Sequence, residues 1–251
     1  MDRLRKKLPL ILLLALLLLA LLPVQMASAA GIPVKVTASD YTPDQWDRID
    51  FTVTMESTAG QALAGVELTV DIPDGLFLVA SSVQMSSGCI PATWTKDYDI
   101  ITEGSGTKLM LHGMYFEFED PLERGTYSGT GGQIATFTCI ATKAGLVGSV
   151  PFSKAGLYPE PSTTNLAGTA TGTEPINVTA KSVKFGDVNN DGDVNLQDVI
   201  ILGRYNANWG VSLDMQAADV NLDGVVNLQD VIILGRKNAN WSEYSILPYL
   251  P

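Results

Sequence analysis

The most constraining feature of this chain is a segment that occurs twice near its C-terminus. Residues 187–209 and 219–241 align over 23 positions at an offset of 32. The only differences are Asn190/Leu222, Asp193/Val225 and Tyr205/Lys237. Self-similarity of this kind marks a repeated structural unit whose copies pack together. This part of the chain is therefore predicted to fold as two copies of one unit.

Each copy begins with a loop rich in Asp, Asn and Gly, with oxygen-bearing side chains at alternate positions. Ca²⁺ takes roughly six to eight oxygen ligands, and a Gly in the middle of such a loop permits its sharp turn. A solvated turn is the simpler interpretation of one such stretch, but two matching copies favour two calcium sites. The spacing fits the known calcium-loop pattern except that the last ligand is Asp instead of Glu. The predicted ligands are Asp187, Asn189, Asp191, Asn195 and Asp198 with the backbone carbonyl of Asp193, and Asp219, Asn221, Asp223, Asn227 and Asp230 with the backbone carbonyl of Val225.

An apolar run follows each loop, at residues 199–204 and 231–236. Each run is entered through Asp or Asn, which favours one short helix per repeat. The segment before the first loop, residues 180–185, is too short and too rich in β-branched residues for a preceding helix. The predicted unit is therefore a loop followed by a helix, without the leading helix of a helix-loop-helix site.

The pattern Asp-x-Asn-x-Asp-Gly-x-Val-Asn-x-x-Asp, followed by an apolar helix with a basic end, resembles the dockerin family, the calcium-dependent docking modules of cellulosome-type assemblies. The resemblance covers roughly residues 183–249. It implies two bound calcium ions, a cohesin-bearing protein as partner, and contacts from the end of each loop and its helix. Well-known members often carry small hydroxyl residues where Leu-Gln stands here, so the specificity class stays open. The implied contact residues are Leu196, Gln197, Arg204, Leu228, Gln229 and Arg236.

Two interpretations of these contact residues remain open. In the first, the nearly identical copies present two equivalent faces related by a pseudo-two-fold axis, and either face engages the same partner. In the second, the leucines pack in the core and the arginines are solvated. We also expect an aromatic residue or a Pro of the tail, residues 244–251, to pack near Phe185; a frayed end is the alternative.

The N-terminus is typical of a secretory signal peptide. Four basic residues precede an apolar run at 8–24, and small residues follow at 27–29. A retained membrane anchor is the alternative, because the run is long for a signal. We expect residues 1–29 to be removed, which would take four basic and one acidic residue and leave 12 Lys+Arg against 26 Asp+Glu. No later segment is apolar enough to span a bilayer.

An acidic mature chain with calcium loops suits the extracellular space, where calcium is plentiful, or a cell surface reached through an assembly. It is a poor candidate for binding nucleic acid, because phosphates repel a strongly negative protein.

Residues 30–180 are long enough for one domain. Apolar and polar residues alternate with a period of two at 49–55, 66–72 and 135–141. Further predicted strands are 34–38, 76–80, 108–114, 148–152 and 176–180. Frequent short strands separated by Gly, Pro, Ser and Asn favour an antiparallel β-sandwich. The expected fold class is mainly β with a small α domain, with the sandwich followed by the duplicated loop-helix module at residues 181–251.

Two segments of this sandwich, residues 64–79 and 131–141, are similar to the paired strand signatures of cohesins and their carbohydrate-binding relatives, which are jelly-roll-like sandwiches. Cohesin is the receptor for dockerin. The resemblance covers most of residues 31–180. A generic extracellular sandwich without a receptor role is the alternative, because alternating strands recur in many sandwiches.

Cys89 and Cys139 are the only cysteines. An even pair in a secreted chain favours a disulfide. Cys139 lies on the apolar face of its strand, so a buried free thiol is the competing interpretation.

No catalytic residues are predicted. His112 is the only histidine, and no Gly-x-Ser-x-Gly, phosphate-binding loop or dinucleotide motif occurs. A pair among the acidic residues of 117–123 could flank a glycosidic bond, but a solvated acidic loop is the simpler interpretation.

Three hypotheses for function follow. The first is a non-catalytic adaptor or scaffold that docks to a cohesin-bearing protein and receives a dockerin-bearing protein through its sandwich. The second is a sandwich that binds a polysaccharide and is tethered by its dockerin, and the third is a small polysaccharide hydrolase. Glycan binding needs exposed aromatic platforms, and Trp46 and Trp94 are the only tryptophans of the sandwich. This thin supply favours the first hypothesis.

Overall fold

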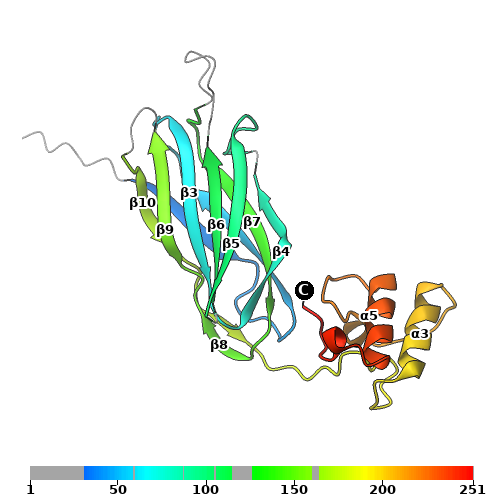
Figure 1. Ribbon diagram of the computed structural model, residues 1–251. Helices are drawn as coiled ribbons and strands as arrows, with labels where there is room; N and C mark the ends of the chain where they lie inside the picture. The colour runs from blue at the N-terminus through cyan, green and yellow to red at the C-terminus, as the bar shows by residue number, and fades with distance from the viewer. Residues whose placement is uncertain are drawn as a thin grey trace, which may run out of the picture.

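The computed structural model describes residues 31–58, 60–86, 88–104, 106–114, 126–159 and 164–250. These residues form an elongated β-sandwich followed by a small helical module, joined by one extended segment (Figure 1). The predicted signal peptide and the acidic residues at 117–123 lie outside the described residues.

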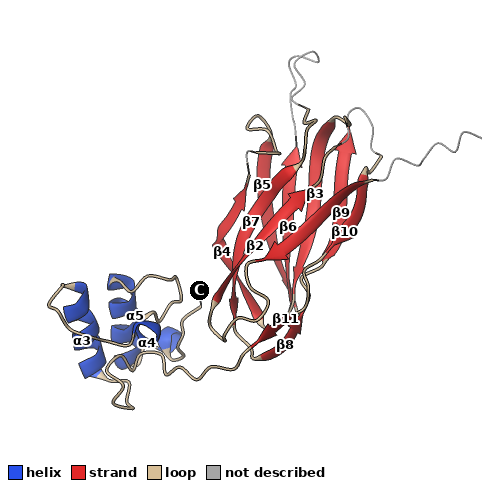
Figure 2. Ribbon diagram, turned by 180° about the vertical axis from the view of Figure 1, so that it is seen from behind, coloured by secondary structure: helices blue, strands red, loops and turns tan. Residues whose placement is uncertain are grey.

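The sandwich has two main sheets, with strand orders β10-β1-β2-β7-β4 and β5-β6-β3-β9, and a small pair β11-β8 at the end nearer the helical module (Figure 2). The strands are β1 Ile32–Ala38, β2 Arg48–Met55, β3 Leu63–Ile72, β4 Leu76–Met85, β5 Thr95–Glu103, β6 Gly106–Met114, β7 Gly132–Ala141, β8 Gly145–Gly148, β9 Phe152–Pro159, β10 Ala167–Thr171 and β11 Ile176–Val178. The antiparallel sandwich is confirmed with one exception, because β1 and β10 pair in parallel.

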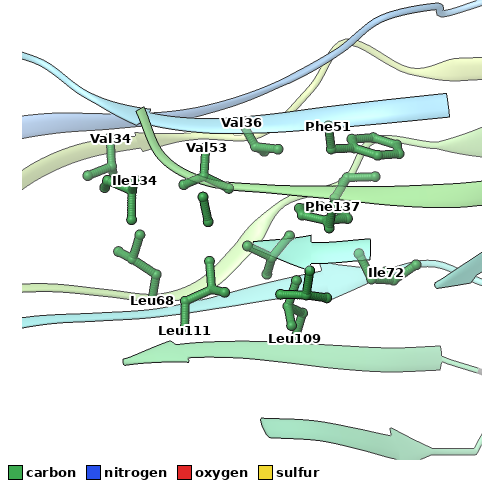
Figure 3. Close-up of a cluster of buried hydrophobic side chains, with 14 of the residues drawn as sticks. Val34, Val36, Phe51, Val53, Leu68, Ile72, Leu109, Leu111, Ile134 and Phe137 are labelled. Carbon is green, nitrogen blue, oxygen red and sulfur yellow. The ribbon is translucent and has the colours of Figure 1, made fainter. Parts of the chain in front are cut away.

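Apolar residues alternate with polar ones along the strands, and the apolar side chains form the core between the two sheets. Figure 3 shows side chains of both sheets meeting there, including Phe51 and Phe137 from the larger sheet and Leu109 and Leu111 from the smaller one. The Phe51 and Phe137 rings are stacked, with centroids 4.9 Å apart. Apolar burial on this scale is the main favourable term in folding a sandwich.

Sequence periodicity located the strands that bury one face. The alternating segments at 49–55, 66–72 and 135–141 lie within β2, β3 and β7. The predicted strand at 148–152 is wrong, because β8 ends at Gly148, which has a φ of +100°, and β9 begins at Phe152. β5 was missed because it is exposed along almost its whole length, so its sequence carries no apolar alternation.

Of the two interpretations of Cys89 and Cys139, the structure has the buried free thiols and not the disulfide. Cys89 Sγ donates a 2.8 Å hydrogen bond to the carbonyl of Gln133. Gln133 and Cys139 lie on the same strand, β7, and six residues of strand span about 20 Å, far beyond the reach of a disulfide. Burial raises the pKa of the Cys89 thiol to about 11 and also raises that of Cys139, so both stay in the neutral thiol form near neutral pH.

The helical module contains α3 Leu196–Asn206, α4 Met215–Ala218, α5 Leu228–Asn238 and the 3₁₀ turn η1 Ser242–Tyr244. One predicted helix per repeat is confirmed, but each begins three residues earlier than the apolar run. Asn195 and Asn227 cap the two helices by accepting hydrogen bonds from the backbone N–H groups of Gln197 and Gln229, both at 2.7 Å. None of the described helices has both the length and the apolar character needed to cross a membrane.

The core of the module is made by residues from both repeats. Val188, Leu202, Ala218 and Leu234 are buried together, and α3 and α5 pack side by side. Each repeat alone has too little apolar surface to bury, so the duplication supplies the second half of the core.

The helical module packs on one end of the sandwich. Trp46 meets Phe185 edge to face, with ring centroids 5.5 Å apart. Phe185 and Leu222 of the helical module share a buried cluster with Ile140 of β7. The Arg48 guanidinium donates to the Leu222 carbonyl. The connecting segment is therefore anchored at its far end.

The C-terminal tail packs on the module. The Tyr249 N–H donates to the carbonyl of Val220 at 2.7 Å, and the Tyr244 and Tyr249 rings stack 4.8 Å apart. The tail side chains that join the Phe185 cluster are Leu247 and Leu250. The predicted packing of the tail near Phe185 is thus present, but it is made by leucines instead of an aromatic residue or a Pro.

We predict that Phe51→Ala destabilises the sandwich by about 3–5 kcal/mol, because it removes a fully buried ring and leaves a cavity beside Phe137. Chemical denaturation followed by tryptophan fluorescence measures this change. Lys35→Ala, at an exposed position of β1, is the control. A loss below about 1 kcal/mol for Phe51→Ala would contradict the described core.

Candidate functional site

The first loop wraps its backbone around two carboxylates. Asp187 accepts hydrogen bonds from the N–H groups of Asp191 at 3.1 Å and Gly192 at 3.0 Å. Asp198 accepts from the N–H groups of Val188 at 2.9 Å and Asn195 at 2.8 Å. Asp187 and Asp198 are buried. The first and last predicted ligands are therefore brought into one closed loop.

The second loop repeats this arrangement. Asp219 accepts from the N–H groups of Asp223 at 3.2 Å and Gly224 at 2.9 Å. Asp230, which is fully buried, accepts from the N–H groups of Val220 at 3.0 Å and Asn227 at 2.8 Å. The two loops have one fold, as the matching sequences predict.

The middle of each loop turns where the sequence places a glycine. Gly192 and Gly224 have φ angles of +94° and +88°, in the region that favours glycine. Asn189 donates to the Asp191 carboxylate at 2.8 Å, and Asn221 donates to that of Asp223 at 3.0 Å. These side chains therefore lie next to each other.

The fourth and fifth predicted ligand groups of the second loop are also adjacent. The Asn227 amide contacts the carbonyl oxygen of Val225 at 3.1 Å. In the first loop, the Asp193 N–H donates to Asp191 at 2.9 Å, as the Val225 N–H donates to Asp223 at 2.8 Å.

Burial and mutual repulsion disfavour the charged state of the second loop. Burial raises the pKa of Asp219, and the charge of Asp223 adds to this effect. Burial also raises the pKa of Asp230, with contributions from the charges of Asp219 and Asp223. A divalent cation relieves both penalties, and a donor set made only of oxygens suits a hard cation such as Ca²⁺.

Backbone and amide donors act differently at the exposed Asp191. The N–H of Asp193 and the amide of Asn189 lower the pKa of that carboxyl group. Asp191 is therefore kept in the charged form that binds a cation.

Carboxylates alone do not complete either site. Within the described ranges, no three His, Cys, Asp or Glu side chains converge closely enough to hold a metal ion. A calcium loop also uses Asn side chains, a backbone carbonyl and water, and the predicted ligand sets include Asn residues and one carbonyl each. The residues present therefore fit calcium when all oxygen donors are considered.

A mixed apolar and basic stripe is exposed on each long helix. On α3, Leu196 is 57% exposed and Ile200 45%, and Arg204 is also exposed. These positions are four residues apart, so they share one face of the helix. The exposed Gln197 lies beside Leu196 at the start of the same helix.

The stripe on α5 has the same composition. Leu228 is 61% exposed and Ile232 44%, followed by the partly exposed Arg236, with the exposed Gln229 at the start of the helix. The interpretation that the leucines pack in the core is therefore wrong. Ile200 and Ile232 were missed by sequence reasoning, although their spacing of four from each Leu and each Arg could have identified them.

The two arginines have different surroundings. Arg236 donates to the Tyr244 hydroxyl at 2.6 Å, and its guanidinium lies 5.1 Å from the ring centroids of both Trp241 and Tyr244. The guanidinium of the exposed Arg204 makes no hydrogen bond, ion pair or ring contact with any described residue. The two faces are therefore not equivalent.

Residues 185–237, which contain both loops, α3, α4 and all but the last residue of α5, match the family model of the dockerin type I domain. This part of the chain is a dockerin type I domain. Domains of this type bind calcium, and their partners are cohesins, as in solved cohesin–dockerin complexes. The dockerin match agrees with the resemblance that the duplicated loops suggest. No curated protein matches the chain.

The sandwich resembles solved cohesins in fold. The second type II cohesin module of the adaptor ScaA scaffoldin of Acetivibrio cellulolyticus is 12% identical, with a TM-score of 0.46, over 59% of this chain and 98% of that one. A type I cohesin–dockerin complex from Clostridium thermocellum, Coh-OlpC-Doc435, gives 13% identity and a TM-score of 0.44 over 61% of this chain and 98% of the other. A non-cellulosomal cohesin from Archaeoglobus fulgidus is 14% identical, with a TM-score of 0.41, over 59% of this chain and 91% of that one. This likeness concerns the fold alone.

We predict that Asp198→Asn and Asp230→Asn each abolish one of two calcium sites, because each removes the charge of a buried ligand while keeping its volume. Isothermal titration calorimetry on the mature chain should give about two ions per chain for the unmodified protein and about one for each variant. The exposed Glu243→Gln is the control. Two ions bound by both variants would show that these carboxylates are not ligands.

Proposed function

We propose that this protein is a secreted, non-catalytic component of a cellulosome-like extracellular assembly, and that its dockerin, folded around two calcium ions, docks it to a cohesin of another protein. The observation that carries the proposal is the exposed stripe of Leu, Ile and Arg that starts directly after a calcium loop. Exposed apolar residues beside an arginine are typical of protein interfaces.

Calcium and docking are coupled through one residue in each repeat. Asp198 is a proposed ligand and also the third residue of α3, where its carboxylate caps the helix by accepting from the Asn195 N–H. A cation held by Asp198 therefore fixes the start of the helix that carries Leu196 and Ile200. Bound calcium supplies positive charge to the buried carboxylates, and the stripe stays in place only while that charge is present.

The outer face of the four-stranded sheet supports a second role, as a receptor for a dockerin of another protein. Ion pairs on this sheet join Lys154 to Glu67 at 2.5 Å and Lys108 to Glu103 at 2.7 Å. Met114, which is 46% exposed, adds apolar surface. A sheet face with both charges and exposed apolar groups suits recognition of a protein surface. With a docking module at its C-terminus and a receptor face on its sandwich, the chain would act as an adaptor.

Glycan binding by the sandwich has less support. Trp94 is only 4% exposed, and Trp46 packs against Phe185. Neither tryptophan of the sandwich is therefore available as an open platform for a sugar ring.

Hydrolysis also has less support. The matched family is an assembly module and not a catalytic domain. The acidic residues considered for glycoside hydrolysis, at 117–123, lie outside the described residues.

We predict that the mature chain binds at least one member of a panel of type I and type II cohesin domains when calcium is present, and releases it when calcium is chelated. Surface plasmon resonance with immobilised cohesins measures both states. The double variant Asp198→Asn with Asp230→Asn should behave in calcium like the chelated protein. Binding to no cohesin, or binding that persists in chelator, would refute the proposed docking.

A further inference from the structure

The two repeats are nearly identical in sequence, but one of their few differences lies at a strained position. Asn190 and the matching Leu222 both have positive φ angles, 56° and 54°. Asn tolerates this left-handed conformation, whereas it is unfavourable for Leu. Leu222 is only 5% exposed, whereas Asn190 is exposed. The packing of Leu222 must therefore compensate for its backbone strain.

The partner of Leu222 is the sandwich of the same chain. Its side chain lies in the cluster with Phe185 and Ile140, and its carbonyl accepts a hydrogen bond from Arg48. Among the residues that the structure describes, every non-glycine residue with a positive φ is Asn except Leu222 and Trp46, and Trp46 packs in the same cluster. The two unusual backbone conformations thus meet at one contact, between the second calcium loop and the sandwich.

The first loop has no such cover. A side chain added at Gly192 would meet no atom within 4 Å, whereas one added at Gly224 would lie 3.7 Å from the Arg48 side chain. In both Figure 1 and Figure 2, α3 lies farther from the sandwich than α5. The loop of the first repeat is therefore more open to a large partner than the loop of the second repeat.

The C-terminal segment also contacts the second repeat. Arg236 is held by the Tyr244 hydroxyl and by the rings of Trp241 and Tyr244. Lys237, which replaces Tyr205 of the first repeat, donates to the carbonyl of Ser245. Two of the three sequence differences, at Leu222 and Lys237, thus serve contacts of the second repeat with the rest of its own chain.

We infer that the dockerin engages its cohesin through the first repeat alone, with Leu196, Ile200 and Arg204 as the contact stripe, while the second repeat is committed to the sandwich and the tail. This inference rests on the proposed docking function. A cohesin approaching α5 would have to displace Arg236 from Tyr244 and Trp241, whereas Arg204 is available without such a loss.

The test compares Arg204→Ala with its matched variant Arg236→Ala in the full mature chain, using a cohesin that binds the unmodified protein. We expect Arg204→Ala to weaken binding at least about tenfold, the loss of one charge-assisted contact, and to leave the calcium-loaded melting temperature unchanged. Arg236→Ala should do the opposite, lowering the melting temperature through the lost tail contacts and changing affinity less than about twofold.

Two results would overturn the inference. One is an equal loss of affinity in the two variants, and the other is full binding by each variant with loss only in the double variant, which is the behaviour of two interchangeable faces. If the unmodified chain binds no cohesin, the proposed function itself fails, so the two failures are distinguishable.

The sandwich contact has its own matched pair. Leu222→Asn introduces the residue that the first repeat has at the matching position. It should release the second loop from the sandwich. The radius of gyration, measured by small-angle X-ray scattering with calcium present, should then increase. Asn190→Leu, in the uncovered loop, should leave it unchanged. No difference between the two variants would show that Leu222 does not hold the modules together.

Discussion

The C-terminal module depends on a buried carboxylate at each junction between loop and helix. Asp198 and Asp230 are fully buried, and each accepts backbone hydrogen bonds from both ends of its loop. Burying a charge is costly unless it is paired, which is why we propose these two carboxylates as calcium ligands. The same carboxylate caps the helix that follows. In the proposed function, metal binding, the start of the helix and the placement of the exposed stripe therefore depend on one carboxylate per repeat.

Duplication gives the module its core, and small departures from it make the module asymmetric. The side chains that pack α3 against α5 come from both copies. Leu222 and Lys237, by contrast, contact the sandwich and the tail. Two of the residues that differ between the repeats thus give the second repeat contacts with the rest of its own chain.

Local patterns predicted local structure well and predicted contacts between distant segments poorly. The loop turns at Gly192 and Gly224 and the helices after them follow from short-range spacing. The exposed strand β5 carries no alternation, so its sequence gives no signal. The sequence left both a disulfide and buried free thiols open for Cys89 and Cys139, because a cysteine count contains no information on position along β7, and the structure has the free thiols. The contact of Arg48 with Leu222 joins positions 174 residues apart, which no local pattern reveals.

The edge-to-face packing of Trp46 on Phe185 has a mechanical consequence. After β11 the chain still contacts the sandwich through Thr179 and Lys181, which pair with Asp44, and it is buried again at Phe185. A short connecting segment with both ends anchored holds the two modules in one relative orientation, whereas a long flexible linker would let that orientation vary. A fibre or scaffold assembled from such units would inherit a set angle at every joint, and its reach toward a solid substrate would be governed by that angle.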